Sequence, residues 1–321
     1  MITVVSMKNE ERLKSVIEEW NRWGASAEVE ALAEAAGNRH KGVAAVLFYG
    51  SCLRGISFDN GIADLYILVD DYHGAFGSRL QALMNRLLPP NVFYLEVPFK
   101  GRTLRAKYAV LTLDDFAKGA HRWFHSYIWG RFAQPCGIVY TRDRDSTEMI
   151  HHALTLALCT FLARALPQAP ETFTLRELWG TGLSLSYGCE LRSEKSTTPV
   201  GLFDAAPDYY ESVTREALKA FFPGVEALPG DGPVRYRARI PSWERRLNGL
   251  AWRLRRGQGK VLSLLRLFKA LFTFENGLDY VLWKIERHSG IRVETGGSLN
   301  RFPLLAVCVK FWKLFRKGAF R

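Results

Sequence analysis

The pattern of apolar and polar positions in the first third of the chain predicts a series of helices and strands. Apolar side chains recur at helical spacing over about residues 7–38. An uninterrupted apolar run at 43–49 then ends at Gly50-Ser51, which predicts a buried strand that leads into a tight turn. The remaining elements predicted here are strands at 62–69, 92–98 and 104–111 and a helix at 76–88. This order predicts a mixed α/β domain over residues 1–113.

From residue 114 onward the apolar positions follow helical spacing. Helices are predicted at 114–130, 147–166 and 174–186 and, after a Pro/Gly-rich linker at 222–233, at 260–274, 278–288 and 303–315. We therefore expect a helical domain at 114–222 that closes a cleft against the first domain. A basic amphipathic region at 234–321 follows.

The charge of the chain is unevenly distributed. The formal net charge is +12, yet residues 234–321 contain 20 Lys and Arg against 5 Asp and Glu, which leaves 24 basic and 27 acidic residues before them. All of the net positive charge therefore lies in the last quarter, which indicates an anionic partner for that region. Five cysteines without a CxxC pair argue against a zinc site.

Candidate chemistry lies at the turn that follows the first strand. Gly50 would let phosphate oxygens approach the backbone, and Ser51 would donate its hydroxyl and amide to one of them. Asp64, which follows Ser51 after twelve intervening residues and lies on the next predicted strand, is a candidate ligand for Mg²⁺. The segment Leu47 to Ser51, with Asp64 on a downstream apolar strand, resembles the polymerase-β-like nucleotidyltransferase superfamily. The alternative is an ordinary Gly-Ser turn beside a charge at a strand edge.

One position departs from that superfamily. Its second carboxylate would stand two residues after Asp64, where this chain has Tyr66. Glu96, in the predicted strand at 92–98, is a replacement metal ligand if that strand lies beside the first. The alternative for Glu96 is a solvated strand residue.

Four further segments narrow the resemblance. They are 64–71 (DLYILVDD), 101–110 (GRTLRAKYAV), 123–135 (WFHSYIWGRFAQP) and 183–192 (LSLSYGCELR). In this order the segments resemble the Tam41/MMP37 family of mitochondrial-type CDP-diacylglycerol synthases, also called phosphatidate cytidylyltransferases. Together with the first strand, the likeness extends over about residues 43–215.

The resemblance implies an activity and a set of roles. The activity is the Mg²⁺-dependent conversion of CTP and phosphatidic acid into CDP-diacylglycerol and pyrophosphate. The implied nucleotide-binding residues are Tyr49, Gly50, Ser51, Lys107 and Arg131. The implied catalytic residues are Asp64, Lys107, Glu190 and Arg192, and the candidate metal ligands are Asp64, Glu96 and Glu190. Solvated charges at element ends, or a surface pair for Glu190 and Arg192, are the structural alternatives.

The basic C-terminal region is interpreted from its own residues. Residues 260–317 combine aliphatic and aromatic side chains with Lys and Arg at helical spacing, which is typical of a helix that lies in an anionic membrane interface. The helical stripes argue against nucleic acid as the partner. The N-terminus lacks the features of a signal peptide. We expect a peripheral protein at the cytoplasmic face of a bacterial-type membrane, with the mitochondrial matrix face as the second option.

Two other functions remain open from the sequence. One keeps the nucleotidyl transfer and changes the acceptor to a small molecule, a protein or RNA. The other is a catalytically inactive nucleotidyltransferase fold that binds membranes or RNA, an interpretation that Tyr66 supports.

Overall fold

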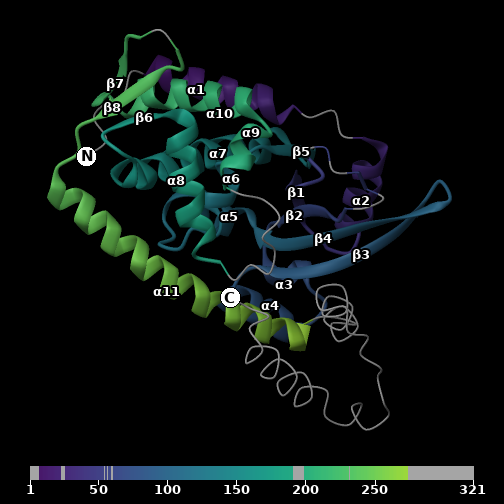
Figure 1. Cartoon of the computed structure of the whole chain (residues 1–321). Helices are drawn as coiled ribbons and strands as arrows, with labels where there is room; N and C mark the ends of the chain where they lie inside the picture. Colours follow the sequence, from purple (N-terminus) through teal and green to yellow (C-terminus); the bar gives the residue numbers. More distant parts are fainter. Residues whose placement is uncertain are drawn as a thin grey trace, which may run out of the picture.

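The computed structural model describes residues 7–22, 26–53, 55, 57–58, 61–190, 199–230 and 232–273 of the 321-residue chain. Within these residues, a five-stranded sheet with the order β3-β4-β2-β1-β5 forms the centre of the N-terminal part (Figure 1). Its strands are β1 (Val43–Tyr49), β2 (Ala63–Val69), β3 (Asn91–Phe99), β4 (Arg102–Thr112) and β5 (Cys136–Thr141). The β2–β4 pair is parallel and the other pairs are antiparallel. The predicted mixed α/β class is confirmed.

The helices begin where short polar side chains can cap them. Ser78, Thr112 and Asp143 each accept a hydrogen bond from a backbone amide three residues later, and Thr174 forms a capping box with Glu177. The helices of the first part are α1 (Met7–Asn21), α2 (Ala27–Gly37), α3 (Tyr72–Ala75), α4 (Arg79–Leu87), α5 (Leu113–His121) and α6 (Trp129–Phe132). Those that follow are α7 (Arg144–Ala165), α8 (Leu175–Tyr187), α9 (Pro199–Asp204), α10 (Pro207–Phe221) and α11 (Ser242–Thr273), with a 3₁₀ turn at Leu166–Gln168.

Several predicted elements need correction. The helix expected over 7–38 is two helices, and the one expected over 114–130 ends at His121 and resumes as the single turn α6. The 222–233 linker contains β7 (Val225–Leu228), which forms a small sheet with β6 (Thr172–Thr174) and β8 (Arg235–Ala238) in the order β6-β8-β7. Strands this short have too few residues to show a clear alternation of apolar and polar positions.

Strand β5 was not predicted, and it joins the sheet beside β1 although it lies beyond residue 113. The division into domains at 113 and 222 remains a prediction, but the first sheet draws on both sides of the earlier boundary. Helix α7 is long and apolar enough to cross a membrane by length and composition. Many of its apolar residues, among them Leu154, Leu158 and Phe161, are buried in the core, as expected for a central helix of a globular fold.

Helix α11 is much longer than the predicted 260–274 segment and runs diagonally along one side of the molecule, from near the small sheet to α4 (Figure 1). Several inward-facing side chains attach it to the rest, among them Trp252, Arg255 and Arg266. Trp252 Nε1 donates to Arg164 O at 2.9 Å, Arg255 Nε to Phe124 O at 2.9 Å, and Arg266 Nε to Pro89 O at 2.8 Å. Helix α11 thus contacts both the helical part and the segment that enters β3. The segments expected at 278–288 and 303–315 lie outside the described residues.

Candidate active site

The register of three strands brings the central candidate residues together. Asp64 at the start of β2 is the Cα partner of Tyr49 at the end of β1 and of Lys107 on β4. Lys107 Nζ lies 2.8 Å from Asp64 Oδ1, and the Asp64 side chain is only 15% exposed. The parallel β2–β4 pairing therefore places a carboxylate and an ammonium side by side where β1 turns away.

Gly50 is required at this turn for two reasons. Its φ of +90° is a conformation that L side chains rarely adopt, and a Cβ built on it would lie 2.3 Å from Asp64 Oδ2. The backbone of the turn thus runs directly against the Asp64 carboxylate. A phosphate that approached this turn could reach both the backbone of residues 50–51 and a metal ion held by Asp64.

Arg131, on the single turn α6, connects this corner to the helical part. Its Nη1 donates to Tyr66 Oη at 3.0 Å, and its Nη2 lies 3.1 and 3.3 Å from the two Glu190 carboxylate oxygens. The guanidinium carbon is 5.5 Å from the centroid of the Tyr49 ring. A guanidinium in this position is fixed by contacts on several sides, as a residue that meets phosphate must be.

Tyr66 explains why the position two residues after Asp64 carries no carboxylate. The Tyr66 ring is fully buried and packs edge-on against Phe132 at 5.0 Å, and its hydroxyl oxygen accepts from Arg131. Burial raises the pKa of Tyr66 well above its ordinary value, so the hydroxyl stays neutral. This position serves to orient Arg131.

The structure does not bring Glu96 to Asp64. Strand β3 pairs with β4 on the side away from β2, so two strand spacings, about 10 Å, separate β3 from β2. Glu96 instead accepts from Tyr94 Oη at 2.7 Å and from Arg105 Nε at 3.1 Å. The condition under which Glu96 was expected to bind metal, a strand beside β1, is not met.

Two further predicted site residues remain, Glu190 and Arg192. Glu190 follows α8 and is ion-paired with Arg131, so its charge is already engaged. Arg192 lies outside the described residues. Within those residues, no three His, Cys, Asp or Glu side chains gather as a metal site. Asp64 beside the turn still fits Mg²⁺, which commonly takes one or two protein carboxylates and completes its shell with substrate phosphates and water.

Tyr127 was not among the site residues predicted from the sequence, although it lies in the 123–135 segment. Trp129 is fully buried, but Phe124 is 39% exposed and Tyr127 belongs to the candidate site. The Arg131 guanidinium carbon is 4.4 Å from the Tyr127 ring centroid and that of Arg266 is 4.2 Å from it. Arg266 was also missed, because nothing in the sequence relates residue 266 to residue 127.

Comparison with known proteins bears on the class of enzyme. Residues 70–197 match the family model described as phosphatidate cytidylyltransferase, mitochondrial (Tam41/Mmp37). The chain is a nucleotidyltransferase enzyme. Within that class, the resemblance to the Tam41/MMP37 family is confirmed over the matched segment, which holds Lys107, Arg131 and Glu190 but begins after Asp64. The family is described as mitochondrial, which agrees with the second of the two locations expected from the sequence.

Two other comparisons add nothing to this assignment. No curated protein matches the chain. A solved nucleotidyltransferase-like protein from Exiguobacterium sibiricum is 14% identical over 91% of this chain and 92% of that one, with a TM-score of 0.25. A likeness at that score supports no conclusion.

Proposed function

We propose that this chain is a phosphatidate cytidylyltransferase that works at a membrane surface. A phosphate oxygen of phosphatidic acid attacks the α-phosphorus of CTP, the bond from that phosphorus to the β-phosphate oxygen breaks, and CDP-diacylglycerol and pyrophosphate form. The observation that carries the proposal is the corner of Gly50, Asp64 and Lys107, in a chain whose residues 70–197 match this family.

The residues of the corner have separate tasks in this reaction. Gly50 and Ser51 offer a backbone turn to the triphosphate. Asp64 would hold Mg²⁺, which, when bound, offsets the negative charge of the triphosphate. Lys107 and Arg131 contribute cations to phosphate oxygens, and Glu190 orients Arg131. The acceptor phosphate is already ionised, so positioning and charge neutralisation supply most of the rate enhancement and no strong base is needed.

The outward face of α11 supports action at a membrane. Eight large apolar side chains on this helix are between 47% and 63% exposed. They are Trp243, Leu247, Leu250, Leu254, Val261, Leu264, Leu265 and Phe268. Their spacing of mostly three and four residues places them on one stripe, which we call the apolar stripe. It begins well before residue 260, where the membrane-binding segment was expected to start.

Exposed cations flank the apolar stripe. Arg246, Arg253, Arg256 and Lys260 follow one another at spacings of seven, three and four residues, and the only acidic residue of the helix is Glu244. An amphipathic helix with this composition is suited to lie in an anionic interface, where each cation contributes about 1 kcal/mol. The remainder of the 260–317 segment, from residue 274, lies outside the described residues.

The test is transfer of label from CTP labelled at the α-phosphate, in the presence of Mg²⁺ and phosphatidate vesicles. We expect label in the lipid fraction and unlabelled pyrophosphate in solution. Vesicles of diacylglycerol, which lacks the attacking phosphate, should remain unlabelled. Absence of lipid-linked label from the folded protein would overturn the proposal. A panel of small-molecule, protein and RNA acceptors with all four NTPs would then identify the alternative.

A further inference from the structure

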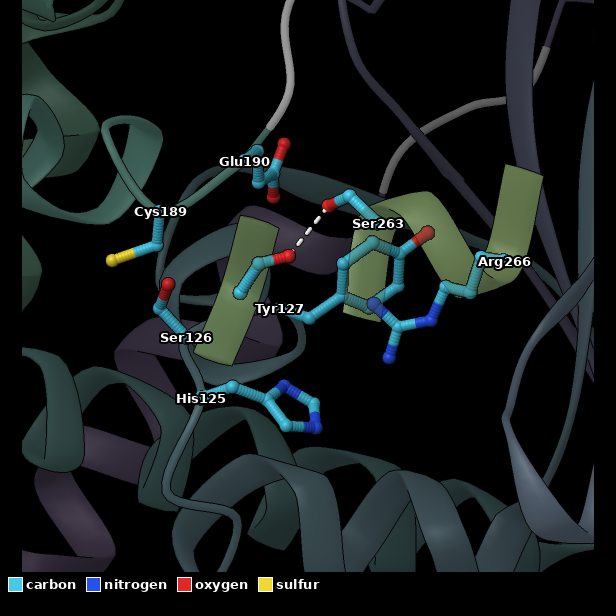
Figure 2. Close-up of a pocket in the computed structure, with 8 residues that line it drawn as sticks. His125, Ser126, Tyr127, Cys189, Glu190, Ser263 and Arg266 are labelled. Carbon is cyan, nitrogen blue, oxygen red and sulfur yellow. Dashed lines mark hydrogen bonds between the residues drawn. The ribbon is translucent and has the colours of Figure 1, made fainter. Parts of the chain in front are cut away.

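Arg266 lies on the inner side of α11, away from the apolar stripe. Its Nε donates to Pro89 O, and its guanidinium lies over the Tyr127 ring, at 4.2 Å from guanidinium carbon to ring centroid (Figure 2). The helix can approach this region closely because Gly259 lacks a side chain, since a Cβ there would lie 2.3 Å from Cys189 O. Helix α11 is therefore fitted against the loop that carries Glu190.

Among the described residues, the charged groups around Tyr127 are mostly positive. Arg131 and Arg266 both lie over its ring, and Glu190 is ion-paired with Arg131. Burial would raise the pKa of Tyr127, but the two guanidinium groups outweigh it and hold the pKa below its ordinary value. The pKa of the nearby Lys269 is lowered to about 7 by burial and then by Arg266. In both groups the charge of Arg266 lowers the pKa, in agreement with the contact between Arg266 and the Tyr127 ring.

A small pocket, partly open to solvent, lies beside these cations. It is lined in part by His125, Tyr127, Glu190, Ser263 and Arg266, as Figure 2 shows. Ser263 Oγ donates to the carbonyl of Gly259 and Ser126 Oγ to that of Ser186, so the hydroxyl protons of both lining serines are engaged.

Two groups of the lining remain available to a ligand. Within the described residues, the two terminal nitrogens of Arg266 have no hydrogen-bond partner, because its contact to Pro89 uses Nε. His125 Nδ1 is buried and has no partner in the same residues. Burial lowers the pKa of His125 to about 4, so at neutral pH the ring is uncharged and one of its nitrogens carries a proton.

We propose that Arg266, with Tyr127 and His125, forms a subsite for the phosphomonoester of the acceptor. A guanidinium fork binds a phosphate through two parallel hydrogen bonds, which the free edge of Arg266 offers. The nucleotide phosphates belong at the Gly50 turn, and Arg131, which contacts both Tyr49 and Tyr127, lies between the two sites. This inference rests on the proposed function and names the residues that would hold its second substrate.

The subsite also gives α11 a double role. Its inner side holds an anionic headgroup, while the apolar stripe on its outer side meets the hydrocarbon of the same lipid layer. The two sides of a helix are about 10 Å apart. This arrangement fits an amphiphilic acceptor that has a phosphate at one end and apolar chains at the other.

The test is equilibrium binding of a soluble short-chain lipid, dihexanoyl phosphatidate, measured by calorimetry without turnover. We expect Arg266→Met to weaken this binding at least tenfold and to leave CTP affinity within twofold. Arg239→Met, an exposed arginine outside every site described above, is the matched control and should bind both ligands as wild type does. Dihexanoylglycerol, which has no phosphate, should bind both variants and wild type equally.

A second variant guards against simple loss of structure. Arg266→Lys keeps a cation and loses the fork, so it should bind dihexanoyl phosphatidate between wild type and Arg266→Met. Unchanged phosphatidate binding in Arg266→Met overturns the subsite, as does an equal loss of CTP binding or a Lys variant as weak as the Met variant. Because binding is measured directly, the subsite stands if these losses occur even when no cytidylyl transfer is found, and that failure would count against the proposed function alone.

Discussion

Two regions of the molecule differ in how their charged side chains are paired. At the corner of the sheet, Asp64 and Lys107 pair one to one across adjacent strands. Around Tyr127, two arginines lie over one ring and Glu190 is ion-paired with Arg131. These cations come from α6 and α11, which are far apart in the sequence. A balanced pair must open when a metal or phosphate binds, whereas an unbalanced group of cations is ready for an anion. The difference predicts which substitutions abolish chemistry and which only weaken binding.

The largest effect should follow from Asp64→Asn. This change keeps the shape of the side chain and removes the charge that pairs with Lys107 and would hold Mg²⁺. We expect cytidylyl transfer to fall by at least about 100-fold, the usual cost of losing a charge-stabilising group in an active site. Initial rates of label transfer measure it, and thermal unfolding should change little. Full activity in this variant would show that Asp64 is not needed for cytidylyl transfer.

Gly50→Ala should come next and has a matched control within the same turn region. Gly50 has φ +90° and no room for a Cβ beside Asp64, whereas Gly55 has φ +96° and nothing within 4 Å of its position. Both alanines should cost about 1 kcal/mol in the free energy of unfolding because of the backbone conformation. Only Gly50→Ala should also lose activity, by about tenfold or more, because the added Cβ displaces the Asp64 carboxylate. Equal activity losses in both would contradict a special role for the Gly50 turn.

The sequence predicted the corner better than it predicted the cationic region, for a physical reason. The apolar run at 43–49 and the strand at 63–69 are local patterns, and their antiparallel pairing places Asp64 opposite Tyr49. Lys107 reaches Asp64 through a long-range strand pairing that the sequence did not predict, and only the family resemblance implied a role for it. The stacking of Arg131 and Arg266 on Tyr127 depends on how α11 docks, and side-chain contacts between distant helices leave no periodic signal.

Glu96 shows that a correctly predicted strand does not by itself locate a site residue. Its strand was predicted with bounds close to those of β3, but the neighbour of that strand was not known. Strand order decides whether a carboxylate reaches Asp64, and β3 lies at the edge beyond β4. Local patterns therefore located the strands, but the order of strands in the sheet determined which side chains lie near Asp64.

A smaller effect should follow from polar substitutions in the apolar stripe. Leu254 and Phe268 are 58% and 53% exposed, so Leu254→Ser with Phe268→Ser should leave the fold intact. We expect binding to anionic vesicles to weaken by about tenfold or more, because two large apolar groups no longer enter the interface. Flotation with vesicles measures this, and transfer to dihexanoyl phosphatidate should be unchanged. Met149→Ser, at an exposed site on α7, is the control. Equal flotation of both variants would exclude the stripe as the contact.

The smallest effect should follow from Glu190→Gln. This variant tests most directly whether the cationic region around Tyr127 is distinct from the metal site at Asp64. As the partner of Arg131, Glu190 orients a cation, and a glutamine can still accept one hydrogen bond from Nη2. We expect transfer activity to fall less than about tenfold, with a raised KM for CTP, because a neutral hydrogen bond replaces a charged one. The concentration of Mg²⁺ that gives half-maximal activity should stay the same. A clear rise in that concentration would show that Glu190 is a metal ligand, and the cationic region would then belong to the metal site.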